Sequence, residues 1–337
     1  IDGQTYYLIL GQSHRHTQLS LCARWGNESH DLHYRHAWDL QSEGWGACTD
    51  HGIHMDPHDW RLTNKMAAFY NRPRAYAAFP AEEWTSSNLR NVWKIYGHLN
   101  IYHLDESRPV YNSNSTKERT PWQVWDDLNP QASLTIPHHT NSSGHPYDWD
   151  AYDPELLPVL EIFQDMRGSS EYVGCPGTTE ADHNENPKQY TWYALEQGYR
   201  IGFIGGGDHN GVALGGLFVR EISREGVFEA LQARRCFATT GCHASVVLRV
   251  GGAFMGGVAE LDGDAACSIK AEVKGEAEVT RLVLVKDAEE IHAVNQATLE
   301  YEDTAARREV SWYYVRAEFE NGELAWSSPV WVETQDH

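Results

Sequence analysis

Histidine and carboxylate side chains recur at the ends of short apolar runs in the first two-thirds of this chain. Fifteen of the 18 histidines lie before residue 210. Neutral imidazoles and carboxylates are the usual ligands of zinc, manganese and iron in proteins. A barrel that gathers its strand ends at one mouth would bring such residues together. The pattern predicts a metal centre, and the ligand candidates are His14, His16, Glu83, His98, His138 and Asp208.

Four of these positions show why the residue types and spacings suit a metal. His14 and His16 stand two apart in an extended segment, so both imidazoles point the same way and can bind one ion. Arg15 then points to the opposite side and is expected to be a structural ion-pair partner. Glu83 can bridge two ions because each carboxylate oxygen can hold one. Asp208 follows three glycines, which let the backbone approach a crowded centre.

Neighbouring histidines and one aspartate are assigned to other tasks. Adjacent histidines cannot easily share one ion from one strand, so His138 is the ligand candidate and His139 is expected to face the substrate or the neighbouring layer. His51, His139 and His209 are candidates for protonating a leaving group, because a histidine pKa near neutrality suits that step. The sequence does not choose among the three. Asp50 is expected to orient a neighbouring group by hydrogen bonding.

The elements that must carry these residues alternate in type over the first 240 residues. About seven apolar runs alternate with helical patterns, which predicts a parallel sheet closing into an α/β barrel. Helices are expected over residues 57–70, 121–128 and 187–197, and the last two begin with a proline in the first turn. Strands are expected over residues 5–11, 44–49, 74–81, 98–103, 133–137, 159–163 and 202–206.

The pattern becomes strand-like after a predicted helix over residues 224–235. Asn321-Gly322 between the last two apolar runs is a strong hairpin signal. We therefore expect two domains, a hydrolase barrel over residues 1–241 and a small β-sandwich over residues 242–337. The strands of the second domain are expected over residues 245–250, 268–273, 279–285, 310–319 and 324–332.

Composition narrows the choice of partner. The chain has 48 acidic and 27 basic residues and a net charge of −21. No nucleic-acid partner is expected, because phosphate binding needs a basic surface. No run of about 18 apolar residues occurs, so no membrane span is expected. Among the 13 Trp and 17 Tyr, some could stack on a small aryl or carbohydrate substrate.

The sequence does not decide the cellular compartment or the oligomeric state. The six cysteines are scattered without a Cys-x-x-Cys pair, which predicts neither a disulfide framework nor a zinc ribbon. The chain begins at Ile1 without a starter Met, which is compatible with removal of a signal peptide or an upstream domain. Cytoplasm, periplasm and secretion therefore remain alternatives, and so does a homo-oligomer.

Together these stretches resemble the polymerase and histidinol phosphatase (PHP) superfamily of metal-dependent hydrolases. That superfamily is marked by a His-x-His motif, a Thr-Asp-His strand end, single Glu and His ligands and a terminal Asp-x-His. The resemblance covers essentially the whole chain, and flanking stretches narrow it to the branch that contains carbaryl hydrolases. Those stretches are YNRP (70–73), EWTS (83–86), GHLNIY (97–102), RRCFATTG (234–241), YYVR (313–316) and AWSSPVW (325–331).

The resemblance implies a fold and a set of cofactors. The fold would be a distorted (β/α)7 barrel of the PHP type followed by a small β-sandwich. The cofactors would be two divalent ions of zinc, manganese or iron that share a carboxylate and a hydroxide. One ion would be held by His14, His16, Glu83 and Asp208, and the other by Glu83, His98 and His138.

The resemblance leaves open whether a third metal ion binds. Such a site would need His51 and two more histidines. The chain instead has Asp208-His209-Asn210 at one expected position and Cys22 near the other. Glu161 matches an acidic strand end that supports the site in the family. The residues assigned to supporting or substrate-contacting roles are Asp50, Glu161, Arg15 and Asn210.

Three functions follow as hypotheses. The first is a metal-dependent hydrolase in which a hydroxide attacks an ester or carbamate carbonyl. The second is a phosphoesterase, which would usually need cationic side chains that clamp the phosphate. The candidate strand ends carry few Arg or Lys residues, Arg15 being the obvious one, so the carbonyl substrate is favoured. The third is a metal-stabilised carbohydrate-binding protein.

Overall fold

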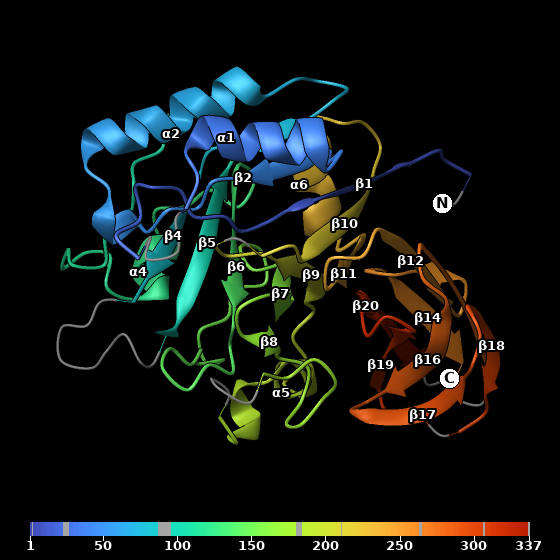
Figure 1. The fold of residues 1–337 in the computed structure, drawn as a ribbon. Coiled ribbons are helices and arrows are strands. Elements are labelled where there is room, and N and C mark those ends of the chain that lie inside the picture. The colour runs from blue at the N-terminus through green and yellow to red at the C-terminus, as the bar shows by residue number, and fades with distance from the viewer. Residues whose placement is uncertain are drawn as a thin grey trace.

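The computed structural model describes residue 1 and residues 3–22, 27–86, 96–179, 184–209, 211–262, 265–305 and 307–335. Asn210, which the sequence assigns to a supporting role, lies outside the described residues. Figure 1 shows a larger part that carries the helices and, to one side, a tail built of strands. The candidate site belongs to the larger part.

The larger part is a mixed α/β fold. Strands β1, β2 and β3 pair in parallel, and so do β7 and β9. Strands β4, β5 and β6 form an antiparallel sheet, and β10 lies antiparallel to both β1 and β11. The bounds are β1 Tyr7–Gln12, β2 Trp45–Ala47, β3 Ala77–Phe79, β4 Ala81–Thr85, β5 His98–His103, β6 Ser133–His138, β7 Val159–Gln164, β8 Gly168–Ser169, β9 Gly202–Gly206, β10 Leu214–Val219 and β11 Cys236–Thr239.

Each of the seven predicted strand segments contains a strand, but among the described residues the pairing does not reproduce a parallel seven-stranded barrel. The sequence analysis did not predict β4, β8, β10 or β11 as separate strands. All residues of β5, β6 and β7 are buried. A run that is buried throughout has the same apolar pattern whether its neighbour runs parallel or antiparallel. The relative direction of the paired strands could therefore not be predicted from the sequence.

Helix α2 (Pro57–Tyr70) spans the predicted residues because its start is strongly specified. Asp56 caps the helix, Asp59 completes a capping box, and Pro57 occupies the first turn. Figure 1 shows α1 and α2 together above β2. The predicted segment 187–197 is instead divided into a 3-10 turn and a short helix, because Tyr190 is extended. The other bounds are α1 His30–Arg35, a π turn at His36–Leu40, 3-10 turns at Gly52–His54 and Pro187–Gln189, α4 Pro121–Trp125, α5 Thr191–Glu196 and α6 Arg224–Gln232.

The tail consists of two sheets that share an apolar core, as expected for a β-sandwich. Burial alternates along β12 and most of β15, so one face of their sheet points inward. The Asn321-Gly322 turn joins β19 to β20, as predicted. The bounds are β12 Ala244–Val250, β13 Ala253–Phe254, β14 Val258–Asp262, β15 Cys267–Gly275, β16 Val279–Lys286, β17 Glu289–Val294, β18 Thr298–Asp303, β19 Val310–Phe319, β20 Leu324–Ser327 and β21 Val330–Gln335.

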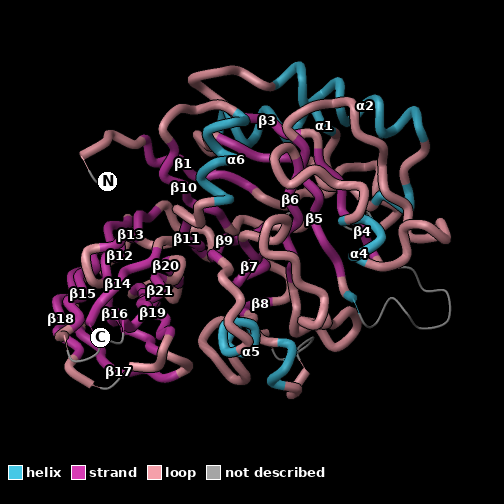
Figure 2. Tube along the Cα trace, turned by 180° about the vertical axis from the view of Figure 1, so that it is seen from behind, coloured by secondary structure: helices cyan, strands magenta, loops and turns pink. Residues whose placement is uncertain are grey.

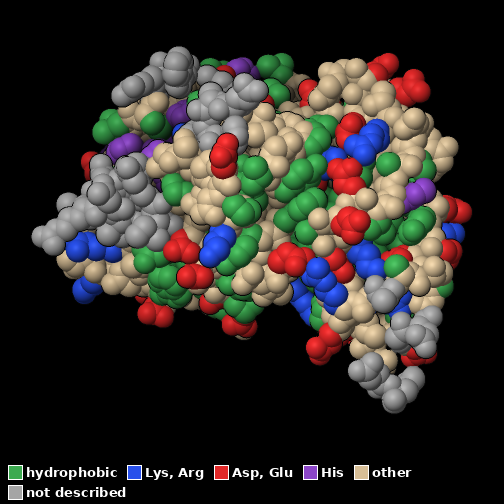
Figure 3. Space-filling view, turned by 90° about the horizontal axis from the view of Figure 1, so that it is seen from below, with side chains coloured by type: hydrophobic (Ala, Val, Ile, Leu, Met, Phe, Trp, Pro, Cys, Tyr) green, Lys and Arg blue, Asp and Glu red, His purple; other side chains and the backbone are tan. Residues whose placement is uncertain are grey.

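The two parts are joined by a continuous sheet. Strand β11 pairs with β20 of the tail, so the sheet that contains β1 to β3 continues into β19 and β21. Seen from behind, β10 and β11 lie between the helices and the tail (Figure 2). The division at residue 241 therefore falls within one sheet, and it stays a prediction. On the face drawn in Figure 3, acidic, basic and hydrophobic side chains are intermixed. Among the described residues, no helix is both long and apolar enough to cross a membrane.

Candidate metal centre

The predicted ligands lie at or near neighbouring strand ends, although not all follow a strand. His14 and His16 follow β1, Asp208 follows β9 and His138 ends β6, whereas His98 begins β5 and Glu83 lies within β4. Beyond β1 and β9, the backbone N–H of His16 donates to the carbonyl oxygen of Asp208 over 2.9 Å. Beyond β2, the chain meets β4, where the N–H of Glu83 donates to the carbonyl oxygen of Asp50 over 3.0 Å. These hydrogen bonds continue the strand pairing past the named strands. Side chains from distant parts of the sequence therefore meet at one edge.

Glu83 is the centre of the cluster. Its side chain is 1% exposed, and imidazoles surround both of its oxygens. Such a carboxylate, with ring nitrogens on all sides, has the chemistry of a bridging ligand. The ring nitrogens near Oε2 belong to His16 at 2.8 Å, His51 at 3.2 Å and His14 at 3.5 Å, and those near Oε1 belong to His98 and to His138 at 3.2 Å.

Asp208 forms the opposite side of the same cluster. Its Oδ1 lies 3.0 Å from Nε2 of His16 and 3.7 Å from Nε2 of His14. Its Oδ2 accepts a hydrogen bond from the side-chain amide of Gln164. The backbone of Asp208 has φ 61°, a conformation that a non-glycine residue adopts at a cost. The surrounding fold therefore holds Asp208 in a strained position that aims its carboxylate at the two histidines.

The donor atoms are compatible with binding of divalent metal ions. An ionised carboxylate taken out of water is costly unless it is paired or binds a metal. Among the described residues, the buried atoms Glu83 Oε2, Asp208 Oδ1, His98 Nε2 and His138 Nδ1 make no hydrogen bond. Imidazole and carboxylate donors of this kind suit zinc, manganese or iron. Two of the compact donor groups, each with ligand atoms within 4.8 Å of one another, are His14, His16 and Asp208, and Glu83, His98, His138 and His139.

The electrostatics of the cluster also call for a cation. Burial by itself lowers the pKa of His14, but the carboxylates of Glu161 and Asp208 outweigh it and raise that pKa to about 10. Burial raises the pKa of Glu83, but His51, His98 and His16 outweigh it and hold that pKa well below its usual range. The pKa of His16 is raised as well, so protons on His14 and His16 balance the carboxylates in the metal-free protein. Divalent ions would displace those protons.

Glu161 orients His14. Its Oε2 accepts from Nδ1 of His14 over 3.2 Å, and its Oε1 accepts from Ser13 Oγ over 2.9 Å and from Asn100 Nδ2 over 3.1 Å. When the proton is on Nδ1, Nε2 of His14 carries the lone pair, and this atom faces the cluster as a possible metal ligand. The supporting position of Glu161 agrees with the role that the resemblance implies.

Asp50 supports His16 through a serine. Its carboxylate accepts from the backbone N–H and the hydroxyl of both Thr17 and Ser20. The Ser20 hydroxyl lies 2.8 Å from Nδ1 of His16 and so accepts from that ring nitrogen. This chain of hydrogen bonds directs Nε2 of His16 toward Glu83 and Asp208, which is the orienting task expected of Asp50.

The three histidines considered as proton donors all line one cavity of about 230 Å³ beside the cluster. His51 lies 2.7 Å from the Thr85 hydroxyl, and His209 lies 2.9 Å from Asn27 Oδ1. His139 is 2% exposed, has φ 35°, and makes no hydrogen bond through Nδ1 among the described residues. The fold brings the three together, and their individual roles stay predictions.

Several residues of the site were not identified from the sequence. Gln164 holds Asp208, and Arg167 lines the cavity, as do the loop residue His145 and Cys22. Gln164 and Arg167 follow the predicted strand 159–163, but a Gln and an Arg beyond a strand end do not have the side-chain type of the usual metal ligands. Burial, the nearby histidines His138 and His98, and the guanidinium of Arg167 together hold the pKa of His139 well below its usual range.

Arg15 does not reach the cavity. Its guanidinium donates to the carbonyl oxygen of Gly211 over 2.6 Å, and its backbone N–H donates to Thr49 Oγ1 over 3.0 Å. Among the described residues, no carboxylate lies within 4.0 Å of its guanidinium. The prediction that Arg15 points away from the metal ligands agrees with this position, but its partner is a backbone carbonyl rather than an acid.

Comparisons with known proteins give distant relatives. No protein-family model matches the chain. An uncharacterized protein of Chlamydia pneumoniae is 23% identical over 83% of this chain, and one of Chlamydia trachomatis is 28% identical over 59%. The chain spans 50% and 38% of the length of these two curated relatives.

Two solved structures are similar in part. One is a two-domain protein from Bacteroides vulgatus described as containing a predicted PHP-like metal-dependent phosphoesterase. It is 13% identical, with a TM-score of 0.47 over 94% of this chain and 91% of that one. The other contains fibronectin(III)-like modules of Clostridium thermocellum CbhA, with 20% identity and a TM-score of 0.23 over 38% of this chain and 66% of that one.

Proposed function

We propose that this chain is a metal-dependent hydrolase of the PHP superfamily that cleaves an ester or carbamate bond. The observation that carries the proposal is the buried Glu83 carboxylate, which touches imidazoles from several strand ends and lies at the wall of a cavity. A structural carboxylate would be expected to have a fixed cation or a full set of hydrogen-bond donors. The resemblance to the carbaryl-hydrolase branch supports the carbonyl substrate.

The chemistry divides between the cluster and the cavity. Divalent ions held by the cluster would lower the pKa of a water from about 15.7 towards about 7 and polarise the substrate carbonyl. The substrate occupies the cavity, where His51, His139 and His209 stand close enough to give a proton. The water oxygen bonds to the carbonyl carbon, and the bond to the leaving group breaks. One of the three histidines, whose pKa values are all lowered, takes the proton that the water releases and gives it to the leaving group.

A phosphate ester is the second candidate substrate, and one observation favours it. Arg167 lines the cavity, whereas Arg15, the obvious cation at the predicted strand ends, does not. A guanidinium beside the reacting centre suits the negative oxygens of a phosphate. The argument from the scarcity of cations at the strand ends is therefore weaker than the sequence indicated.

The test is a hydrolysis panel on protein of measured metal content. Naphthyl carbamate, naphthyl acetate and nitrophenyl phosphate are offered to the wild type, Glu83→Gln and His16→Ala. Removing a ligand of the cluster should lower kcat/KM by at least about 10³-fold, since the water loses its activation. The bound metal, measured by elemental analysis, should fall in the same variants.

Glu82→Gln is the matched control. Glu82 neighbours Glu83 in β4, is fully buried, and accepts a hydrogen bond from the backbone N–H of Tyr111. Burial raises the pKa of Glu82 well above its usual range, so the neutral amide resembles the protonated acid. This variant should keep both metal and activity. Full metal content and full activity in Glu83→Gln would reject the proposed function.

A further inference from the structure

We infer that the Cys22 thiolate is a ligand of the metal ion that His16 holds, and that His209 binds the same ion. Cys22 was not among the predicted ligands, and His209 was expected to be a candidate proton donor. The inference rests on the metal centre of the proposed function and adds a soft ligand to it. A thiolate would make the centre prefer zinc over manganese, because soft ligands favour zinc whereas manganese suits oxygen ligands.

Three donor atoms meet on the cavity side of the cluster. A ring nitrogen of His16, a ring nitrogen of His209 and Sγ of Cys22 all lie within 4.8 Å of one another. A Zn–S bond and a Zn–N bond together span about 4.4 Å, so the three donors need to close only slightly around one ion. All three residues also line the cavity of about 230 Å³.

Asn27 determines which nitrogen His209 presents. Its side-chain Nδ2 donates to the carbonyl oxygen of Thr17 over 3.3 Å, which leaves Oδ1 as the acceptor. That oxygen lies 2.9 Å from Nδ1 of His209 and accepts from it. When the proton is on Nδ1, Nε2 of His209 carries the lone pair, and it lies 3.5 Å from Asp208 Oδ1. His209 therefore presents a ligand atom to the cluster.

Asp208 links His209 to the ion that His16 holds. Its Oδ1 lies 3.0 Å from Nε2 of His16 and 3.5 Å from Nε2 of His209, and the two rings are stacked with centroids 4.7 Å apart. This buried oxygen makes no hydrogen bond among the described residues. Nδ1 of His16 is bonded to the Ser20 hydroxyl, so His16 has only Nε2 to give to a metal. The added ligands therefore join its ion and do not form a separate site.

Hydrogen bonds hold the loop that ends at Cys22. The backbone N–H of Ser20 donates to Asp50 Oδ1 over 3.1 Å, and the Ser20 hydroxyl donates to the same oxygen over 2.7 Å. The N–H of Leu21 donates to Nδ1 of His54 over 3.2 Å. These bonds extend to the residue before the cysteine, so the fold sets the position of Cys22 beside the cavity.

Packing does not explain Cys22. A free cysteine usually serves as a small apolar side chain in a core, as the fully buried Cys48 and Cys236 do. Cys22 is only partly buried, and imidazoles and carboxylates make up most of the cavity that it lines. Burial raises the pKa of its thiol, so a bound ion would displace a proton from it, as metals do from the thiols that they bind.

Cobalt reports thiolate ligation directly. Metal-free wild type, Cys22→Ser and Cys242→Ser are titrated with Co²⁺, and the sulfur-to-cobalt charge-transfer absorption in the near ultraviolet is recorded. Cys242 is the matched control, because it is also partly buried but does not line the cavity. The wild type and Cys242→Ser should show the absorption, and Cys22→Ser should lose it. Its absence in the wild type, or its persistence in Cys22→Ser, overturns the inference.

Metal affinities test the preference for zinc. Cys22→Ser should bind zinc at least about 10-fold more weakly, since even the loss of a residue that only supports a ligand has an effect of this size. Its affinity for manganese should change less. His209→Gln should also bind zinc more weakly. An unchanged zinc affinity in either variant removes that residue from the ligand set.

Alkylation tests the wild type without any substitution. The rate at which iodoacetamide modifies Cys22 is followed by mass spectrometry in the metal-free, zinc-loaded and manganese-loaded protein. Zinc should slow the reaction by at least about 10-fold, because the ion occupies the thiolate that would attack the reagent. Manganese should protect less, and the rate at Cys242 should not change. Equal rates at Cys22 with and without zinc contradict the inference.

Hydrolysis by the same samples separates this inference from the proposed function. If the wild type shows the Cys22-dependent absorption but hydrolyses neither the naphthyl esters nor nitrophenyl phosphate, the hydrolase proposal fails and the thiolate ligand stands. If the wild type hydrolyses one of them in a manner that depends on Glu83 but shows no such absorption, the hydrolase proposal stands and the thiolate ligand is rejected.

Discussion

Two buried glutamates in this molecule are neutralised in different ways. Glu171 is fully buried where the larger part meets the tail, and fixed donors surround its carboxylate. Arg316 Nη1 lies 2.9 and 3.0 Å from its two oxygens, Tyr314 Oη lies at 2.5 Å and Trp326 Nε1 at 3.0 Å. Glu83 is equally buried, but its neighbours are imidazoles that are positive only when protonated.

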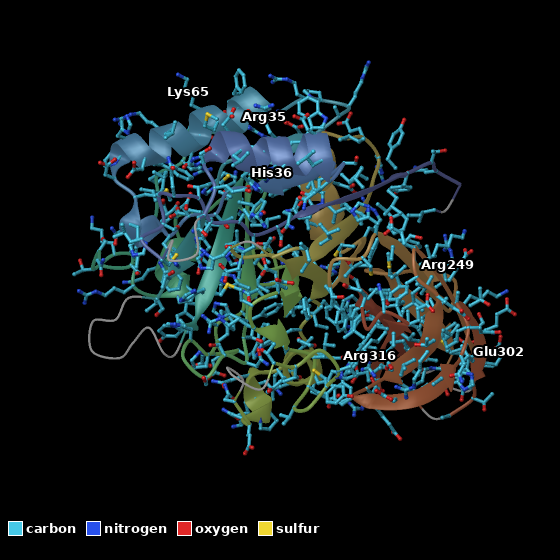
Figure 4. All side chains as sticks on the ribbon, in the orientation of Figure 1. Arg35, His36, Lys65, Arg249, Glu302 and Arg316 are labelled. Carbon is cyan, nitrogen blue, oxygen red and sulfur yellow. The ribbon has the colours of Figure 1, made fainter. Side chains whose placement is uncertain are left out.

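The difference teaches how to separate structural from functional acids. Arg316 is always charged, so the Glu171 carboxylate has its counter-charge within the protein, although Nε of Arg316 makes no hydrogen bond among the described residues. Figure 4 shows Arg316 on the side of the tail toward the larger part, whereas Arg249 and Glu302 lie on its outer side. The Glu83 group has no such cation, and the four buried donor atoms of its cluster named above make no hydrogen bond among the described residues. Under the proposed function, a metal ion would complete this site.

The largest loss of stability is expected when the ion pair between Glu171 and Arg316 is broken. Glu171→Gln leaves the buried guanidinium of Arg316 without its principal counter-charge, which should cost about 3–5 kcal/mol of unfolding free energy. Urea unfolding followed by tryptophan fluorescence measures the loss. Glu302→Gln on the exposed strand β18 is the control and should change the stability little. If Glu171→Gln loses bound metal while keeping its stability, the two acids do not differ as described.

Removal of bound metal tests the assignment of Glu83 and its surrounding histidines as a metal site. At free zinc about 100-fold above Kd, binding to the folded state adds about 2.7 kcal/mol, so a chelator should lower the stability of the wild type by that amount. Glu83→Gln should show little of this difference, since its site is damaged. Glu82→Gln should respond to the chelator as the wild type does. Equal chelator effects in Glu83→Gln and the wild type would contradict the assignment of Glu83.

The smallest expected effect comes from an exposed ion pair across the same boundary as Glu171. Arg308 Nη1 lies 2.8 Å from Glu196 Oε1, and the arginine side chain is 53% exposed. Water and salt screen such a pair, so Arg308→Met should change the unfolding free energy by about 0–1 kcal/mol. Thermal unfolding at low and high salt measures it. If Arg308→Met loses as much unfolding free energy as Glu171→Gln, solvent exposure does not explain why the two ion pairs should differ in their contribution to stability.

Much of the candidate site was predictable because its residues have few alternatives. The His14 and His16 spacing, the Glu83 carboxylate and the glycines before Asp208 suit metal binding by residue type alone, and the structure brings these side chains within contact distance. Helix α2 was predictable for a similar reason, because its capping residues are local. In each of these cases the signal lies within a few residues of sequence.

Other features depended on contacts that a sequence does not display. Gln164 supports Asp208 across 44 positions, and Ser20 joins Asp50 to His16 across 30. Nothing about an isolated Gln or Ser marks such a role. The direction of β5 was equally hidden, because buried strands look alike in either direction, and β4 and β10 were not predicted as separate strands.

The sequence by itself determined the chemistry of the ligands, the start of the main helix and the strand-rich nature of the tail, since residue type and local spacing control these properties. The tertiary structure alone decided which charges meet. It turned Arg15 toward a backbone carbonyl, placed Arg167 in the cavity, and paired Glu171 with Arg316 of the tail. The physical reason is that electrostatic interactions act over a few ångströms in space, whatever the separation along the chain.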